Sequence, residues 1–104
     1  MEFARAISEI VPDDSFGFVH TAFALHEMKR TKEAMDVLLP VVDKFPDEWL
    51  MRYNLARYSS QLGQKKDAIK WLEKATSLAG KKDIRMMALE DTDLEPLWMK
   101  IAEI

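Results

Sequence analysis

The feature that most constrains this chain is an internal repetition with a period of thirty-four residues. Small or apolar residues recur at that interval in the pairs Ala22 and Ala56, Met28 and Leu62, Ala34 and Ala68, Met35 and Ile69, Val37 and Trp71, Leu38 and Leu72, and Val41 and Ala75. Each copy has helical spacing on both sides of a turn. Repeated helix pairs bury a continuous core by stacking on one another, so the period predicts an all-α solenoid.

The small positions, together with Pro46 and Gly80 near the repeat ends, make the chain similar to the tetratricopeptide repeat family, of a small bacterial type or a fragment. The resemblance implies a right-handed solenoid of helix-turn-helix units in a single domain, residues 1–104. About two full repeats are expected, at residues 15–46 and 49–80. They are flanked by an N-terminal half repeat, residues 1–11, and by a C-terminal capping helix pair, residues 83–104.

Three residues depart from the repeat pattern. Lys29 stands where Gly63 forms the turn of the next repeat, so we expect either a different turn or a strained lysine. Pro40 lies inside the second helix expected for the first repeat and should bend its axis. Arg52 replaces the aromatic residue that Phe18 supplies in the first repeat, which leaves the packing there open.

The run Ala-Leu-Glu-Asp-Thr-Asp-Leu-Glu-Pro-Leu, residues 88–97, resembles the segment that ends many bacterial tetratricopeptide arrays. Thr92 and Glu95 have the spacing of a capping box, which predicts the start of a final helix there. One face of that helix carries Leu94, Leu97, Trp98 and Ile101. We expect this stripe to close the last exposed face of the solenoid.

Composition narrows the classes of partner. Apolar residues make up 48% and charged residues 32%, which is typical of a soluble globular domain and not of a membrane protein. The net charge is -3 with both signs interspersed, so no nucleic-acid partner is expected. The chain has no cysteine, which excludes disulfides and thiolate metal sites. Its first residues lack a signal peptide, so cytoplasmic residence is expected unless the chain is a fragment.

In tetratricopeptide proteins the first helix of each pair lines a concave groove, and the resemblance therefore assigns candidate partner-binding residues. They are Phe16, Val19, His20, Phe23, Leu50, Tyr53, Asn54, Arg57, Ile84 and Met87. This surface is unusually apolar, which implies a covering partner. The alternative is that several of these residues belong to the core, with the register shifted by one position.

A familiar activity of the family is to grip the C-terminal carboxylate of heat-shock chaperones, but of the five positions that do so only Asn54 matches here. That mode is therefore not expected. Asn54 and Arg57 lie one turn apart and could still hold a peptide backbone or a carboxylate. The alternative for the pair is that Asn54 bonds a neighbouring helix and Arg57 is solvated.

Catalysis has little support in the sequence. His20 and His26 are six residues apart on different faces of one helix, so they cannot chelate a metal together. No phosphate loop, nucleophile elbow or Cys-His pair is present. We therefore expect no catalytic residue, no metal and no cofactor.

The sequence thus predicts a non-catalytic module that binds a peptide or helix of another protein in the groove. The first alternative is a homodimer or larger homo-oligomer that buries the apolar groove or the N-terminal face. An enzyme or a metal-binding protein is the remote third alternative, because a fold does not dictate function.

Overall fold

The computed structural model describes residues 15–103, and within them all regular structure is helical. The α-helices are α2 (Ser15–Glu27), α3 (Thr31–Leu38), α4 (Trp49–Gln61), α5 (Lys65–Ala79), α6 (Lys81–Glu90) and α7 (Trp98–Glu103). Two 3-10 helices, η1 (Val42–Lys44) and η2 (Thr92–Leu97), complete the described part. The predicted all-α repeat fold is confirmed, while the expected half repeat at residues 1–11 lies outside the described residues.

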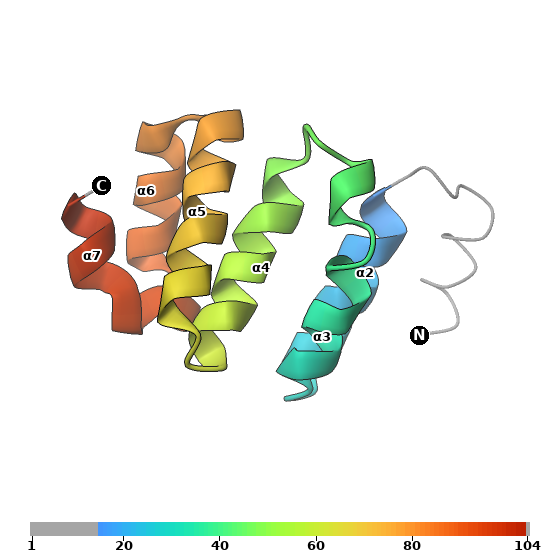
Figure 1. Cartoon of the computed structure of the whole chain (residues 1–104). Helices are drawn as coiled ribbons and strands as arrows, with labels where there is room; N and C mark the ends of the chain where they lie inside the picture. Colours follow the sequence, from blue (N-terminus) through green and yellow to red (C-terminus); the bar gives the residue numbers. More distant parts are fainter. Residues whose placement is uncertain (1–14, 104) are drawn as a thin grey trace.

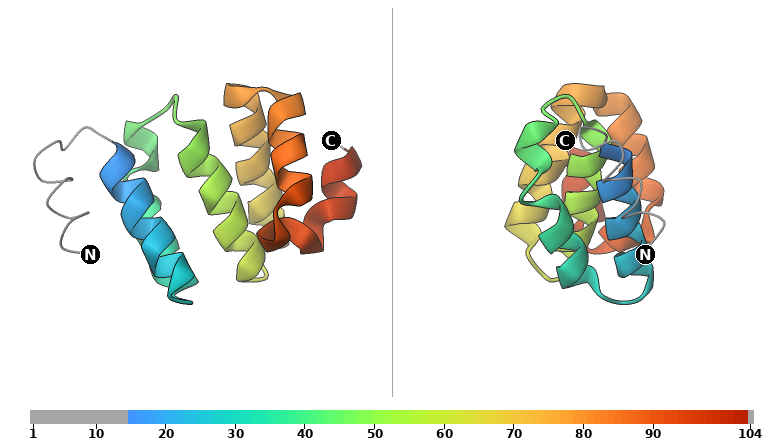
Figure 2. Two further views of the ribbon diagram at one scale, coloured as in Figure 1. Left: turned by 180° about the vertical axis from the view of Figure 1, so that it is seen from behind. Right: turned by 90° about the vertical axis from the view of Figure 1, so that its right-hand side faces the viewer.

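The helices stand side by side in a row, as two pairs followed by α6 and its C-terminal extension (Figure 1). The pairs α2 with α3 and α4 with α5 make the most extensive contacts. Seen from behind, α2 and α6 lie in front of α3 and α5 (Figure 2, left). The surface carried by α2, α4 and α6 is called the first-helix face below, and it is the surface to which the sequence assigned the groove.

The core consists of two clusters of buried side chains. The first contains Ala22, Leu25, Ala34, Met35, Leu38, Val42, Met51, Leu55 and Tyr58. The second contains Tyr53, Ala56, Ala68, Leu72, Ala75, Ile84, Ala88, Leu94, Leu97 and Ile101. Trp71 packs against both clusters and so joins the two halves of the row. The repeated alanines are fully buried at the helix contacts, where a larger side chain would hold the helices apart.

The segment after α3 differs from the sequence prediction. The expected bend at Pro40 is wrong, because α3 ends at Leu38 and a turn follows. Proline has no amide hydrogen for the next helical bond, and its ring conflicts with the carbonyl four residues earlier. The chain therefore leaves the α-helix and forms the short η1 helix before α4.

Arg52 explains how this irregular segment is stabilised. Its buried guanidinium group donates hydrogen bonds to the carbonyl oxygens of Phe45 at 2.8 Å, Glu48 at 2.9 Å and Val42 at 3.2 Å. Backbone carbonyls that leave a helix must find other donors when they are buried. Arg52 therefore supplies the bonds that an uninterrupted helix would have made itself.

The two intra-repeat turns have the same conformation although their residues differ. Lys29 has a φ of 64° and Gly63 a φ of 79°, both in the left-handed region. The following amides donate equivalent bonds, from Arg30 to the carbonyl of Leu25 and from Gln64 to the carbonyl of Ser59, each at 2.9 Å. Of the two expected alternatives, Lys29 therefore adopts the strained one.

A substitution pair tests this strain. Lys29→Gly should raise the free energy of unfolding by about 0.5–1 kcal/mol, because glycine adopts a positive φ without a Cβ conflict. Gly63→Ala should lower it by a similar amount, and since a Cβ at Gly63 would meet no atom within 4 Å, that loss is purely conformational. Urea denaturation followed by circular dichroism measures both. A loss of stability in Lys29→Gly would contradict the argument.

Candidate functional site

The residues assigned to the groove divide into a buried and an exposed group. Tyr53 and Asn54 are each 3% exposed and Ile84 is 1% exposed. The exposed large apolar members are Phe16 at 53%, Phe23 at 40%, Leu50 at 36% and Met87 at 40%. His20 is exposed as well, while Val19 and Arg57 are half-buried.

The burial of Tyr53, Asn54 and Ile84 differs from the expectation of an open groove. Tyr53 and Ile84 belong to the second core cluster, together with Leu94 and other residues that follow α6. The cause is that η2 packs directly against α4. The C-terminal segment thus covers part of the first-helix face itself.

The covering segment begins with a tight acidic turn, residues 91–93. The Asp91 carboxylate accepts a hydrogen bond from the backbone amide of Asp93 at 3.0 Å, which is a typical aspartate-stabilised turn. Asp91 is therefore the residue that caps η2, and the predicted capping box of Thr92 and Glu95 is wrong. The predicted apolar stripe is nevertheless present, since Leu94, Leu97 and Ile101 are all buried.

Arg57 holds the acidic turn on α4. Its Nη2 donates to Asp93 Oδ2 at 2.8 Å, and its Nε lies 3.1 Å from Asp91 Oδ2 as an ion pair. A third contact runs from Nη1 to Asn54 Oδ1 at 3.2 Å. The Tyr53 hydroxyl donates to Asp91 Oδ2 at 2.8 Å. Arg57 thus binds carboxylates, as its chemistry suggests, but they are carboxylates of its own chain.

His26 extends this contact to α2. Its Nε2 donates to Asp93 Oδ2 at 2.9 Å, because a carboxylate can only accept, and its Nδ1 lies 3.0 Å from Thr31 Oγ1. The imidazole also packs against the Tyr58 ring, with centroids 4.8 Å apart. Gln61 adds a bond from Nε2 to the Asp93 carbonyl at 2.9 Å. Asp93 of η2 therefore contacts both α2 and α4.

The ionisation of these groups follows from their surroundings. Burial alone would raise the pKa of Asp93, but its hydrogen bonds to His26 and Arg57 outweigh burial and leave the pKa below the ordinary value. Burial would lower the pKa of Arg57, yet the charges of Asp91 and Asp93 raise it overall. Burial raises the pKa of Tyr58 to about 12, so its phenol stays protonated. Asp93 and Arg57 are therefore both charged near neutral pH.

The exposed and half-buried apolar or aromatic residues on the remainder of the first-helix face are together called the open patch. It consists of Phe16, Val19, His20, Phe23, Leu50 and Met87. The Phe16 ring stacks on the His20 imidazole, with centroids 5.5 Å apart and planes 14° from parallel. The Arg57 guanidinium carbon lies 6.0 Å from the centre of the Phe23 ring. The patch is thus apolar and aromatic, and it borders the acidic turn at Phe23.

Two other kinds of site receive no support from the described residues. Residues 15–103 contain no group of three or more His, Cys, Asp or Glu side chains that could hold a metal ion. No helix in that part of the chain has both the length and the apolar composition needed to cross a membrane.

Comparison with known families adds to this geometry. A family model described as tetratricopeptide repeat matches residues 51–82, which comprise most of α4, all of α5 and the first residues of α6. Residues 51–82 are thus similar to a tetratricopeptide repeat, which supports the family resemblance inferred from the sequence. No curated protein and no solved structure matches the chain.

The similarity to tetratricopeptide repeats concerns the helices that form the first-helix face. Repeats of this family mediate binding to other proteins and are generally non-catalytic. The matched region overlaps the second repeat expected from the sequence, residues 49–80, and includes Arg57. In this chain part of the first-helix face is covered by the chain's own C-terminal segment.

Asp93→Asn tests the role of the acidic turn. At neutral pH the substitution should lower the free energy of unfolding by about 1–3 kcal/mol, because it weakens charge-assisted bonds to Arg57 and His26. The Asp93 pKa is depressed in the folded chain, so its contribution is complete above about pH 4. It is lost as the pH falls through the folded-state pKa. The variant should therefore lose less stability than the wild type over that acid range.

Glu33→Gln is the matched control, since it removes an exposed ion pair with Arg30. We expect little change in stability from it, because exposed pairs contribute little. Urea titrations at several pH values measure all three proteins. Equal losses in the two variants would contradict a specific role for Asp93.

Proposed function

We propose that this chain is a non-catalytic interaction module that binds a peptide or helix of another protein on its first-helix face. The observation that carries the proposal is the open patch, where four large apolar side chains are each more than a third exposed. Exposed apolar side chains gathered on one face are typical of surfaces that a partner covers. The family's general role in protein binding supports the same conclusion.

The proposed anchors are the apolar members of the open patch. Phe16 and Phe23 lie two turns apart on α2, and an amphipathic helix or an extended strand can place apolar side chains at matching intervals. Large aromatic residues commonly supply most of the binding energy in such interfaces. Leu50 and Met87 would extend the contact to α4 and α6.

The polar residues of the original assignment receive a different role in this proposal. Arg57 and Asn54 could hold a partner's carboxylate only if that partner displaced Asp93, which already occupies Arg57. Tyr53 and Ile84 support the face from beneath, because both are buried. Partner recognition therefore rests on Phe16, Val19, His20, Phe23, Leu50 and Met87.

A second copy of the chain is the alternative occupant, since it too could cover the open patch. Sedimentation velocity over a range of concentrations distinguishes a second copy from a different protein. If the chain stays monomeric at every concentration, the occupant of the open patch is a different protein. The proposed setting, a bacterial cytoplasm, rests on the sequence resemblance and composition alone.

The double variant Phe16→Ala, Phe23→Ala tests the proposal. Immobilised wild-type chain should retain at least one protein from a bacterial lysate that the variant loses. Once that protein is purified, its affinity for the variant should be lower by about tenfold or more, because buried aromatic anchors typically contribute over 1 kcal/mol each.

The matched control is Leu78→Ala, Met86→Ala, which removes apolar side chains of similar exposure, 40% and 58%, outside the open patch. All three proteins should unfold at nearly the same temperature, because the substituted side chains are exposed. An identical set of retained proteins for wild type, test and control would overturn the proposal.

A further inference from the structure

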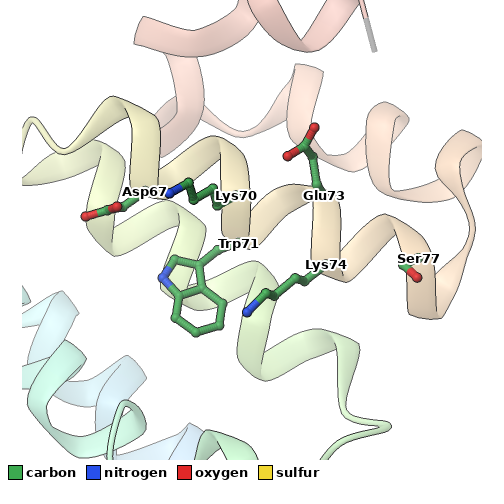
Figure 3. Close-up of a pocket in the computed structure, with 6 residues that line it drawn as sticks. All are labelled: Asp67, Lys70, Trp71, Glu73, Lys74 and Ser77. Atoms are coloured by element: carbon green, nitrogen blue, oxygen red, sulfur yellow. The ribbon is translucent and has the colours of Figure 1, made fainter.

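The outer side of α5 carries two hollows that lie apart from the open patch. One is lined by Asp67, Lys70, Trp71, Glu73, Lys74 and Ser77 (Figure 3). The Lys74 ammonium group lies 4.8 Å from the centre of the Trp71 ring. Two acidic and two basic side chains balance each other there, so this hollow has no charge preference that would select a ligand.

The second hollow lies between α5 and the segment formed by η2 and α7, and its volume is about 510 Å³. Its apolar lining is Ile69, Pro96 and Leu97. Its charged lining is Lys65, Lys66, Lys70, Lys100 and Glu73. It is called the lysine hollow below, because four of its five charged residues are lysines.

The four lysines of the lysine hollow outnumber its one acidic residue, Glu73. The ion pairs found among residues 15–103 involve His26, Arg30 and Arg57, and none involves a lysine. This concentration stands out in a chain whose net charge is -3. An anionic group entering the hollow would therefore meet several unpaired ammonium groups at once.

The stability of α5 does not explain this arrangement. Lys66 and Lys70 are four residues apart on one helix, where like charges repel each other. Lys65 and Lys66 also occupy the first turn of α5, where the helix dipole disfavours positive charge. The lysines thus cost α5 some stability, which a favourable contact with an external anion would offset.

We propose that the lysine hollow binds an acidic segment of a partner protein, with one apolar side chain of that segment inserted against Ile69 and Pro96. Aspartate or glutamate side chains on either side of the inserted residue would pair with Lys66, Lys70 and Lys100. The volume is in the range of ligand-binding hollows, and charge complementarity would orient the segment. This surface is separate from the first-helix face and does not depend on the function proposed for that face.

The shape of the hollow favours a peptide over an anionic membrane surface. Leu97 is 2% exposed and Ile69 is half-buried, so these two residues form a recessed floor, with the exposed Pro96 beside them. Peripheral membrane binding instead places apolar side chains outward, where they can enter the lipid. A protruding peptide side chain can reach a recessed apolar floor, whereas a flat headgroup layer cannot.

The experiment uses a synthetic fifteen-residue peptide with a single central leucine flanked by aspartates and glutamates, labelled for fluorescence anisotropy. A control peptide replaces the acids by asparagine and glutamine. Wild-type chain should bind the acidic peptide at low ionic strength, and more weakly as salt is added. The amide peptide should bind at least about tenfold more weakly, because it lacks the paired charges.

Charge reversal at the hollow supplies the matched comparison. Lys66→Glu, Lys70→Glu should reduce affinity for the acidic peptide by about tenfold or more. Lys81→Glu, Lys82→Glu changes the net charge by the same amount, but at the start of α6. This variant should reduce the affinity for the acidic peptide by less than about threefold. Glu73→Gln should raise affinity about twofold, since it removes the one anion from the hollow. That gain cannot result from misfolding.

Four results would overturn the proposal. They are equal losses in the two lysine double variants, equal binding of both peptides, no change in Glu73→Gln, and no binding of the acidic peptide at low salt. If the wild type sediments with phosphatidylserine vesicles but does not bind the acidic peptide, the hollow instead binds a membrane surface. If Lys66→Glu, Lys70→Glu dissociates a dimer of the wild type, its occupant is a second copy.

Discussion

The contact on which the C-terminal half depends is the ion cluster of Arg57 with Asp91 and Asp93. Arg57 is only 17% exposed, and a charge at that depth is costly unless it is paired. The two aspartates lower that cost by pairing with Arg57. The same ion pairs hold Asp91 and Asp93 at one place on α4. Because Leu94 follows directly, the cluster also determines where η2 enters the core. The acidic turn and the apolar stripe are thus two parts of one attachment.

This attachment divides the first-helix face into two regions. At one end, His26 and Arg57 bind Asp93 of the same chain. At the other end, Phe23, Leu50 and Met87 of the open patch are each more than a third exposed. The division explains why only part of the surface that the sequence assigned to the groove is exposed. The cation over the Phe23 ring marks the border between them.

The repeat fold could be predicted from the sequence because the positions of Ala56, Ala68 and Leu72 relative to the turn at Gly63 are local properties of helices. The open patch was predicted in part for the same reason, since Phe23 lies on a helix face that repeats every thirty-four residues. The burial of Tyr53 was not predictable. It depends on the packing of η2 against α4 and on a hydrogen bond to Asp91, thirty-eight positions away, and no local periodicity encodes that distance.

Pro40 and Arg52 show a second limit. Both were visible as departures from the repeat, but their relation was not, because it required knowing that the helix ends rather than bends. Once α3 ends, the backbone carbonyls of η1 and of the residues after it need hydrogen-bond donors. The Arg52 guanidinium group donates these bonds. His26 was likewise recognisable only as a polar helix residue until Asp93 was placed beside it. In each case the missing information was the position of an irregular segment.

The division of the first-helix face can be measured directly by hydroxyl-radical footprinting of the intact chain with mass spectrometry. Phe23 and Met87 should react readily in the folded state, because both are well exposed. Tyr53 should be protected as strongly as the fully buried Tyr58 and should become reactive only on unfolding. If Tyr53 reacts as fast as Phe23 in the folded chain, the acidic turn does not cover α4 and the division of the face is wrong.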